Sequence, residues 1–447
     1  MLPSVLVANR GEIARRVIRG CRRLGVRAIA VYSEADAGWP HVADADEAVL
    51  IGPPAARESY LDFERVLGAA RTTGARAVHP GYGFLSENWR FAKACEEAGL
   101  VWIGPPWRVI QQMGDKVAAR RRMREAGVPV VPGSEGALDS LEAAGEVGER
   151  IGYPLMLKAA AGGGGIGMVR VADAAALPAA WASAQRRAQA AFGSGALFVE
   201  RYVTEPRHIE VQVFGDTGGQ VVHLHERECS IQRRHQKLVE ESPAPAVDPD
   251  VKARLVDAAV RGARAVGYVN AGTMEFIVQG REAYFLEMNT RLQVEHPVTE
   301  EVTGLDLVEW QLRVASGEPL PLPQEKIVQR GAALECRIYA EDPAKNFMPS
   351  PGVIGRLALP AGPGVRLETG VAEGVQVSVH YDPLLAKVVT RGDTREEAIA
   401  RMQAALDGFV VEGVRTVIPF HQRVLASAAF RAGRVHTQMV EQGGFNA

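Results

Sequence analysis

The sequence predicts a protein that is α/β at its amino end and α+β beyond it, and the spacing of its apolar residues is the reason. Apolar runs at residues 4–8 and 27–32 enclose an amphipathic stretch at 13–24, and further runs follow at 77–79 and 100–103. Such alternation of strand-like and helix-like segments is typical of a doubly wound parallel sheet. We therefore expect an open parallel sheet with helices on both faces in the first hundred residues.

A second compact unit is expected after the proline-rich stretch at residues 129–133. It should contain strands at 155–158, 168–171 and 197–200 and a helix at 177–191. Four consecutive glycines separate the first two of these strands. A P-loop or a dinucleotide fingerprint leads into a helix, so this pattern instead predicts a strand–loop–strand hairpin.

Strands should dominate from residue 203 to about 317, and the run EPLPLP at 318–323 has the composition of a stiff linker. A last region of short strands opens at 332–338. The helices expected in these parts lie at 249–266, 395–407 and about 419–426.

Composition excludes several classes of function. The 447 residues carry a net charge of −2, which leaves no electrostatic footprint for nucleic acid or an anionic membrane. No apolar run approaches membrane-spanning length, and the amino end has no signal-peptide pattern. The cysteines stand far apart, which argues against zinc and disulfides and fits a reducing cytoplasm: Cys21, Cys95, Cys229 and Cys336.

The segment FLEMNTRLQVEH at residues 285–296 carries more polar chemistry than packing requires. An extended conformation would place alternate side chains on one face, namely Glu287, Asn289, Arg291, Gln293 and Glu295. A strand at 272–278 and a turn at 279–282 would complete a hairpin with it. In that hairpin Glu275 and Glu287 become cross-strand neighbours.

Two opposed carboxylates need a cation. At about 5 Å they repel by roughly 3 kcal/mol at an effective dielectric of ~20. Glu275, Glu287 and Asn289 offer hard oxygen donors, which suit Mg²⁺ together with substrate phosphates. The alternative is a solvated acidic strand face.

The glycine run and nearby lysines predict a phosphate site. Consecutive glycines let backbone amides turn toward an anion, and Lys116 and Lys158 supply positive charge. The alternatives are a floppy surface linker and ordinary solvated lysines. Glu200, at the end of the same unit, suits the exocyclic amine of adenine as an acceptor.

Residues 223–237 form a third cluster, dense in charge. It is either a solvated face or one wall of an anion site. Apolar residues are too few for a core helix and glycine is too scarce for a simple loop, which favours the anion site. Cys229 within it is expected to be a passive thiol.

Together these segments resemble biotin carboxylase, the ATP-grasp component of acetyl-CoA and related carboxylases. The ordered set of motifs covers essentially the whole chain and is highly specific. The motifs are VANRGEI at 7–13, HPGYGFLSEN at 79–88, the glycine loop, QRRHQK at 232–237, the segment 285–296, ECRIYAE at 335–341 and YDPLLAK at 381–387.

The resemblance implies an ATP-grasp fold in three domains. These are an amino-terminal domain at 1–113, an ATP-grasp domain at 114–318 with a mobile glycine-loop lid at about 131–202, and a carboxyl-terminal domain at 330–440. The implied ATP contacts are Lys116, Lys158, Gly164, Gly165, Glu200, Arg201, Tyr202, Val203, His208, His235, Glu275 and Glu287. Two Mg²⁺ ions, with Mn²⁺ as an alternative, would be held by Glu275, Glu287 and Asn289.

The resemblance also implies the catalytic machinery, made of Lys237, Arg291, Glu295 and Arg337. Bicarbonate would be held by Lys237, Arg291, Gln293 and the Val294 backbone. Glu295 would remove its proton, and Arg337 would stabilise the enolate-like ureido oxygen of biotin between Tyr82 and Gly83. Carboxyphosphate would form and break to CO₂ and phosphate, and the phosphate would deprotonate biotin under a closed lid.

The implied partners follow from what the sequence lacks. There is no AMKM biotin-attachment motif and no transcarboxylase region, so biotin is expected on a separate biotin carboxyl carrier protein, with carboxyltransferase subunits beside it. A cytoplasmic homodimer without nucleic acid or membrane is expected. The chain departs from the family pattern at Ala161, Ile166 and Arg201, which puts ATP affinity and lid motion in question.

Two other functions compete with this reading. A carbamoyl-phosphate or amino-acid ligase of the ATP-grasp group would share Glu275, Glu287 and Asn289 but would not need Arg337. A catalytically silent nucleotide-sensing scaffold is the second alternative. The presence of Arg291 and Glu295 argues against it, since a silent subunit has no use for a base.

Overall fold

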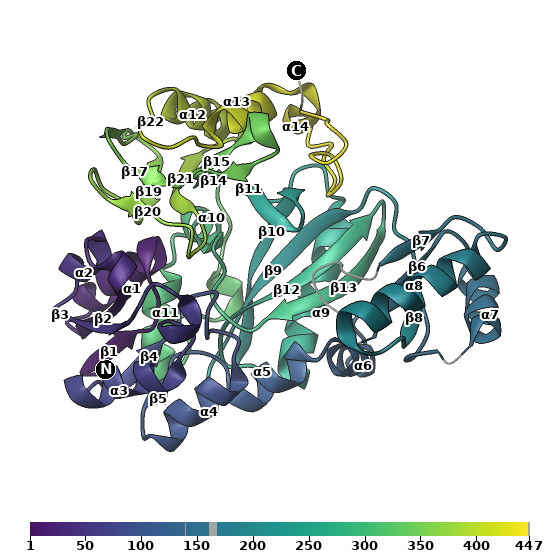
Figure 1. Ribbon diagram of the computed structural model, residues 1–447, viewed down its shortest axis with the longest axis horizontal. Helices are drawn as coiled ribbons and strands as arrows, with labels where there is room; N and C mark the ends of the chain where they lie inside the picture. Colours follow the sequence, from purple (N-terminus) through teal and green to yellow (C-terminus); the bar gives the residue numbers. More distant parts are fainter. Residues whose placement is uncertain (139, 161–167, 446–447) are drawn as a thin grey trace.

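The computed structural model describes residues 1–138, 140–160 and 168–445, arranged around three main sheets (Figure 1). Figure 1 shows the amino-terminal unit (purple) and the carboxyl-terminal unit (yellow-green) at one side of the view and a small β6–β8 unit projecting at the other. The sequence predictions at Ala161, Gly164, Gly165 and Ile166 lie outside the described residues.

The amino-terminal sheet is parallel throughout, in the order β3-β2-β1-β4-β5. Val5 and Val7 pack in the same core cluster as Ile13, whereas Leu6 and Phe91 belong to a separate cluster on the other face. Buried side chains on both faces are what a doubly wound sheet requires, so this prediction is confirmed. Its elements are β1 (Ser4–Val7), β2 (Arg27–Ser33), β3 (Glu47–Gly52), β4 (Ala77–His79), β5 (Val101–Trp102), α1 (Gly11–Arg23), α2 (Pro40–Asp44), α3 (Phe63–Thr73), α4 (Trp89–Glu97) and α5 (Trp107–Gly114).

The projecting unit contains the predicted hairpin. Its sheet has the order β7-β6-β8, and Leu155 lies opposite Val171 in an antiparallel pair, so the glycine run does join two strands. Trp181 and Ala184 of its long helix pack against the sheet. Its elements are α6 (Lys116–Glu125), which leads into it, α7 (Leu141–Ile151), β6 (Leu155–Ala159), β7 (Val169–Val171), α8 (Leu177–Phe192) and β8 (Leu197–Arg201).

The central sheet has eight strands in the order β13-β12-β9-β10-β11-β14-β21-β19. It continues across residues 318–323, because β14 pairs with β11 and Leu334 lies opposite Glu241. Its strands are β9 (Arg207–Gly215), β10 (Val221–Arg233), β11 (Gln236–Ser242), β12 (Asn270–Gln279), β13 (Glu282–Asn289), β14 (Ala332–Tyr339), β19 (Val365–Thr369) and β21 (Leu384–Gly392).

Helices cover this sheet, and short two-stranded sheets surround its carboxyl-terminal end. Leu255 of α9 shares a core cluster with Val211 and Met274 of the sheet. The helices are α9 (Pro249–Ala265), α10 (His296–Thr303), α11 (Leu307–Ala315), α12 (Arg395–Asp407), α13 (Ile418–Ala426) and α14 (Ala428–Arg431). The short strand pairs are β15 (Glu341–Asp342) with β16 (Met348–Pro349), β17 (Gly352–Val353) with β20 (Gln376–Val377), and β18 (Leu357–Ala358) with β22 (Val410–Val411). Among the described residues, no helix combines the length and apolar character needed to cross a membrane.

One prediction about local structure needs correction, and one open alternative is decided. Residues 285–296 are not one strand: β13 ends at Asn289, and 290–295 form a loop before α10. The last pair of this ladder is Thr273 with Asn289, although β12 itself continues to Asn270. Of the two alternatives for the charged cluster at 223–237, the solvated face is excluded, because the cluster forms the β10–β11 hairpin, in which most side chains are buried.

Candidate active site

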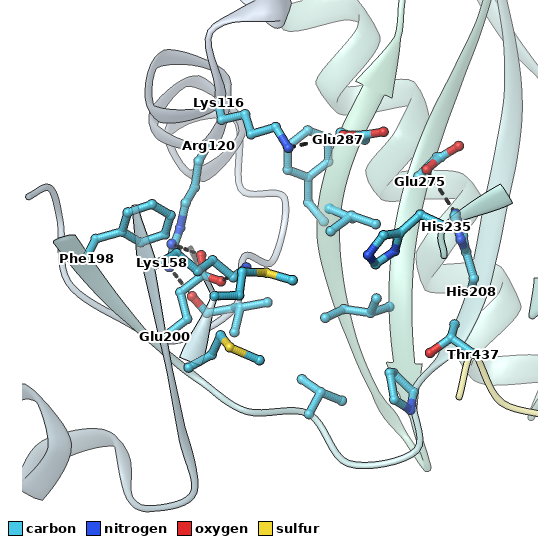
Figure 2. A pocket seen from close by; sticks show the side chains of 18 of the residues that line it. Lys116, Arg120, Lys158, Phe198, Glu200, His208, His235, Glu275, Glu287 and Thr437 are labelled. Atoms are coloured by element: carbon cyan, nitrogen blue, oxygen red, sulfur yellow. Dashed lines mark hydrogen bonds and ion pairs between the residues drawn. The ribbon is translucent and has the colours of Figure 1, made fainter. Parts of the chain in front are cut away.

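A cavity of about 1050 Å³ lies between the projecting unit and the central sheet (Figure 2). This volume is at the upper end of the range for small-molecule sites, so it suits a nucleotide with its phosphates. Of the residues that the sequence predicts for the site, those that line the cavity are Lys116, Lys158, Glu200, Arg201, Tyr202, Val203, His208, His235, Lys237, Glu275, Glu287, Asn289, Arg291, Gln293, Val294 and Arg337.

Glu200 anchors the side of the cavity formed by the projecting unit. Its two carboxylate oxygens accept hydrogen bonds from Arg120 and Lys158, one from each (Figure 2). Arg120 comes from α6 and Lys158 from β6, so this carboxylate joins two elements. In this conformation the Lys158 ammonium therefore faces Glu200.

Glu275 and Glu287 lie opposite each other on β12 and β13, as predicted. The turn alone would not produce this pairing, because Gln279 lies opposite Glu282 and the register shifts between Glu275 and Phe276. A β-bulge of this kind re-aims the side chains beyond it. The bulge brings the two carboxylates to one side of the hairpin.

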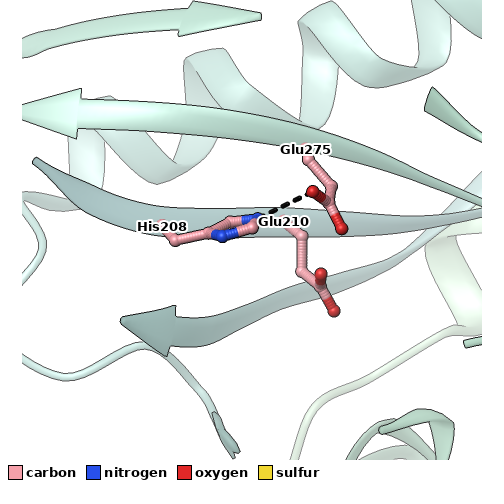
Figure 3. A group of neighbouring side chains, drawn as sticks. All are labelled: His208, Glu210 and Glu275. Carbon is pink, nitrogen blue, oxygen red and sulfur yellow. Dashed lines mark ion pairs between the residues drawn. The ribbon is translucent and has the colours of Figure 1, made fainter. Parts of the chain in front are cut away.

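Cations and amides surround Glu275. Its Oε2 lies 2.9 Å from His208 Nε2 (Figure 3), and its Oε1 accepts from Lys237 at 2.7 Å. Asn289 Nδ2 donates to the same Oε1 at 2.8 Å and Gln293 Nε2 donates at 3.1 Å. The positive charge expected beside this carboxylate is thus present.

Lys237 is the centre of a buried ion cluster. Its ammonium donates to Glu275 and, at 2.7 Å, to Glu295, and it also donates to Glu210. Glu210 in turn accepts from Arg227, a guanidinium with no exposed surface. Such a cluster is stable only when each buried charge has partners, and here the signs alternate through it.

Glu295 lies beneath the cavity and is held by two cations. Arg337 Nη2 donates a hydrogen bond to its Oε2 at 2.8 Å, and the Lys237 ammonium donates one to its Oε1. Arg337 also donates through Nε to Glu240 at 2.6 Å. The carboxylate is therefore fixed between β11 and β14, the strands that carry the two cations.

The loop at residues 290–295 directs Arg291 along the cavity wall. Its guanidinium donates to Gln293 Oε1 at 2.9 Å and to Asn289 Oδ1 at 3.0 Å. Its Nε donates to Glu87 Oε2 at 3.1 Å. Glu87 belongs to the amino-terminal unit, so Arg291 ties that unit to the site.

The cluster shifts the pKa values of its members. Burial alone would raise the pKa of Glu295, but Lys237 and Arg337 hold it well below its ordinary value of 4.5. The pKa of Glu275 is lowered in the same way, against burial, by Lys237 and His208. Burial raises the pKa of Glu240 to about 7, although Arg337 opposes this. Glu275 and Glu295 are therefore anionic at neutral pH.

The donor set fits a magnesium ion. Glu275 and Glu287 oppose each other, and the Lys116 ammonium lies 3.9 Å from Glu287 (Figure 2). Carboxylate and amide oxygens with room for phosphate are what Mg²⁺ prefers. A second group, His208, Glu210 and Glu275 (Figure 3), has its ligand atoms within 4.8 Å of one another, and the Lys237 ammonium already sits against both of its carboxylates.

Some predicted residues lie away from the cavity. Tyr82 and Gly83 are not among its lining residues, and Tyr82 is held through its carbonyl by Asn9 at 2.7 Å. Sequence reasoning missed Arg120, Glu210, Glu87, Glu240 and Lys387 as members of the site. Glu210 had a usable signal, because it alternates with His208 and Gln212 along one strand. The others depend on contacts between segments far apart in the chain.

The fold and this site are those of an ATP-grasp enzyme, with a cavity between a small projecting unit and the central sheet and an acidic pair in its lining. Family models support this assignment along the chain. Biotin carboxylase, N-terminal domain, matches residues 1–110; carbamoyl-phosphate synthase L chain, ATP binding domain, matches 115–323; and biotin carboxylase C-terminal domain matches 335–442. The chain belongs to the biotin carboxylase family, ATP-dependent ligases that form a carbon–nitrogen bond on biotin.

Comparison with individual relatives supports the same family assignment. Biotin carboxylase of Halalkalibacterium halodurans is 53% identical over 441 residues, covering 98% of this chain and 97% of the relative. The mitochondrial methylcrotonoyl-CoA carboxylase subunit alpha of Arabidopsis thaliana is 52% identical over 98% of this chain, which spans 60% of that protein. The biotin carboxylase domain dimer of Hydrogenobacter thermophilus 2-oxoglutarate carboxylase, crystallised with MgADP, ADP and bicarbonate, is 46% identical with a TM-score of 0.92, covering 100% of this chain and 99% of that one.

Proposed function

We propose that this chain carboxylates biotin carried by a separate biotin carboxyl carrier protein, with ATP and bicarbonate, as the first half-reaction of an acetyl-CoA or related acyl-CoA carboxylase. One observation supports this above the others: Glu295 is held between Lys237 and Arg337, two cations that line the cavity. A carboxylate base between two cations suits a reaction in which bicarbonate is deprotonated and the negative charge on the biotin ureido oxygen is stabilised.

ATP would occupy the cavity with its phosphates toward Glu275 and Glu287. Mg²⁺ bound there with Asn289 would neutralise charge on the transferring phosphoryl group. Lys158, which faces Glu200 in this conformation, would turn to the phosphates as the lid closes, and Glu200 would then accept from adenine. The remaining proposed nucleotide contacts are Lys116, Gly164, Gly165, Arg201, Tyr202, Val203, His208 and His235.

Bicarbonate is a poor nucleophile and must be aligned against the γ-phosphorus. Arg291 and Gln293 already contact each other at 2.9 Å and would hold it, with Lys237 and the Val294 backbone. Bicarbonate would take over the Lys237 ammonium from Glu295. Because Lys237 is a cause of the low pKa of Glu295, this exchange would raise the basicity of the carboxylate as its substrate arrives.

Biotin would enter from the side of Tyr82 and Gly83. Arg337 would stabilise the negative charge that develops on its ureido oxygen, since a preorganised guanidinium costs no reorganisation at that moment. The phosphate released from carboxyphosphate would take the ureido proton.

We also propose the domain boundaries 1–113, 114–318 and 330–440, and a homodimer that works with carrier and carboxyltransferase subunits. The biotin carboxylase domain dimer of the Hydrogenobacter thermophilus relative supports the homodimer.

Phosphate release from ATP tests the proposal. With Mg²⁺ and bicarbonate present, free biotin should raise the rate for the intact chain, and Glu295→Gln should abolish the increase. A control without bicarbonate measures the background. If biotin fails to raise phosphate release, the proposed function is wrong, and an ATP-grasp ligase with another acceptor becomes the better reading.

A further inference from the structure

A buried lysine from the carboxyl-terminal part of the sheet reaches the loop that carries the bicarbonate residues. Lys387 lies on β21 with no exposed surface. Its Nζ donates to the Val294 carbonyl at 2.7 Å and lies 3.2 Å from Glu12 Oε1. It also lies 5.9 Å from the centre of the Tyr82 ring. One ammonium therefore contacts the loop and two segments of the amino-terminal unit.

The contact with Val294 matters because the loop at 290–295 belongs to no strand or helix. Side chains from elsewhere hold its backbone instead: Glu87 accepts from the Thr290 N–H at 3.1 Å, and Lys387 donates to the Val294 carbonyl. Because a peptide unit is planar, fixing that carbonyl also fixes the direction of the Glu295 N–H. Lys387 thus fixes the peptide that leads into Glu295, whereas Lys237 and Arg337 hold its side chain.

Neighbouring strands hold consecutive residues of this loop. Lys387 lies opposite Arg337 in the β14–β21 pair. Arg337 donates a hydrogen bond to the Glu295 carboxylate at 2.8 Å, and Lys387 donates one to the carbonyl of the preceding residue, Val294. Two cations that face each other across a ladder destabilise a sheet. Packing alone therefore gives no reason for placing both of them there.

The ion pair with Glu12 does not by itself explain why a lysine is buried at position 387. Neither of its oxygens accepts a hydrogen bond from any described residue, although the ion pair with Lys387 is 3.2 Å long. The hydrogen bond of the ammonium goes to Val294 instead. Glu12 therefore compensates the buried charge, and the directed contact is the one to the loop.

We propose that Lys387 is a positioning residue for the bicarbonate loop: by holding the Val294 carbonyl it sets the Val294–Glu295 peptide in the position that bicarbonate requires. This inference rests on the proposed function. It goes beyond it by assigning bicarbonate affinity to a side chain that touches no substrate.

The test measures bicarbonate-dependent phosphate release for three variants of the intact chain. Lys387→Met should raise the KM for bicarbonate roughly tenfold or more, because misplacing a reacting group by about 1 Å costs up to ~100-fold in rate. The KM for ATP should stay within about twofold. Glu12→Gln keeps the contact to Val294 and should leave the bicarbonate KM near that of the wild type.

A double variant separates positioning from folding. Lys387→Met alone leaves Glu12 as a buried charge without its partner, which can unfold the chain. Lys387→Met/Glu12→Gln removes both charges, so it should melt near the wild type and still show the raised bicarbonate KM. A wild-type bicarbonate KM in the double variant overturns the proposal, as does a parallel rise in the KM for ATP. Absence of bicarbonate-dependent turnover in the wild type would instead overturn the proposed function, and this inference with it.

Discussion

Glu295 shows how a single side chain acquires its properties from residues far away in sequence. Lys237 from β11 and Arg337 from β14 each take one of its oxygens. Neither cation is near it along the chain, and both are buried. The same carboxylate on an exposed strand would have an ordinary pKa, whereas here it is anionic and oriented.

Replacing Arg337 tests this arrangement. Arg337→Ala should lower biotin-dependent phosphate release roughly 100-fold or more, the loss typical when a charge-stabilising donor is removed. Nucleotide binding, measured by titration, should persist because Arg337 is not among the proposed nucleotide contacts. Arg337→Lys serves as control and should recover part of the rate, since it keeps the charge without the planar fork. Equal loss of nucleotide binding and turnover would indicate unfolding instead.

The lowered pKa of Glu368 makes the free energy of unfolding depend on pH. It is buried on β19, and although burial would raise its pKa, Arg366 and Arg19 lower it from 4.5 to about 2. A depressed pKa contributes stability above the unfolded value, and that contribution is lost as pH falls through the folded value. The contribution is about 3 kcal/mol at neutral pH and disappears between pH 4.5 and 2.

Chemical denaturation of the wild type and Glu368→Gln at several pH values measures this. At pH 7 the wild type should be the more stable by about 3 kcal/mol. The difference should shrink steadily below pH 4.5, where the carboxylate is protonated in the unfolded chain. A difference that stays constant down to pH 3 would show that the ion pairs are not its source.

At the scale of elements, the tip of the β10–β11 hairpin combines strain with function. Arg233 lies opposite Gln236, so Arg234 and His235 form a two-residue turn, with φ angles of 50° and 66°. Both values lie in the left-handed region, as in the type I′ turns that favour Asn and Gly. His235, predicted to contact ATP, is placed in the cavity by this turn (Figure 2).

Arg234→Asn should stabilise the protein by about 0.5–1 kcal/mol, because Asn tolerates this conformation better than Arg. The Arg234 backbone N–H, which donates to Glu441 at 3.1 Å, is kept. The midpoint of urea unfolding measures the effect. Arg234→Ala is the matched control and should give no stabilisation. If both variants behave alike, the turn conformation is not what the substitution relieves.

At the scale of the whole molecule, the central sheet joins parts that the sequence separates with a proline-rich run. β11 of the first part pairs with β14 of the second, and Arg337 crosses to the site from the latter. The apolar residues Leu238 and Val239 of β11 belong to a core cluster shared with Leu334 and Ile338. The carboxyl-terminal part is therefore a structural necessity for the site.

A chain ending at Pro323 tests this dependence. It should expose β11 as an apolar sheet edge, and such edges promote aggregation. Size-exclusion chromatography and near-UV circular dichroism should show association and loss of fixed packing, compared with the intact chain. A monomeric, well-packed fragment that still binds ATP would show that the sheet does not need its carboxyl-terminal strands.

The sequence alone determined the α/β amino-terminal unit, the glycine-loop hairpin and the pairing of the strands that carry Glu275 and Glu287, because each depends on periodicity or on a short turn; the register that sets these two carboxylates opposite each other also required the bulge. It also indicated that cations must surround the acidic pair. It could not determine that β13 ends at Asn289, since the backbone beyond that residue is held by side chains of distant segments, Glu87 and Lys387.

Only the tertiary structure decided how the predicted residues meet. The cluster of Lys237 with Glu210 and Glu295 and the contact of Lys387 with Val294 join segments distant along the chain. Their physical reason is burial: a charge inside the protein must find partners, and the fold, not the local sequence, determines which ones lie within reach.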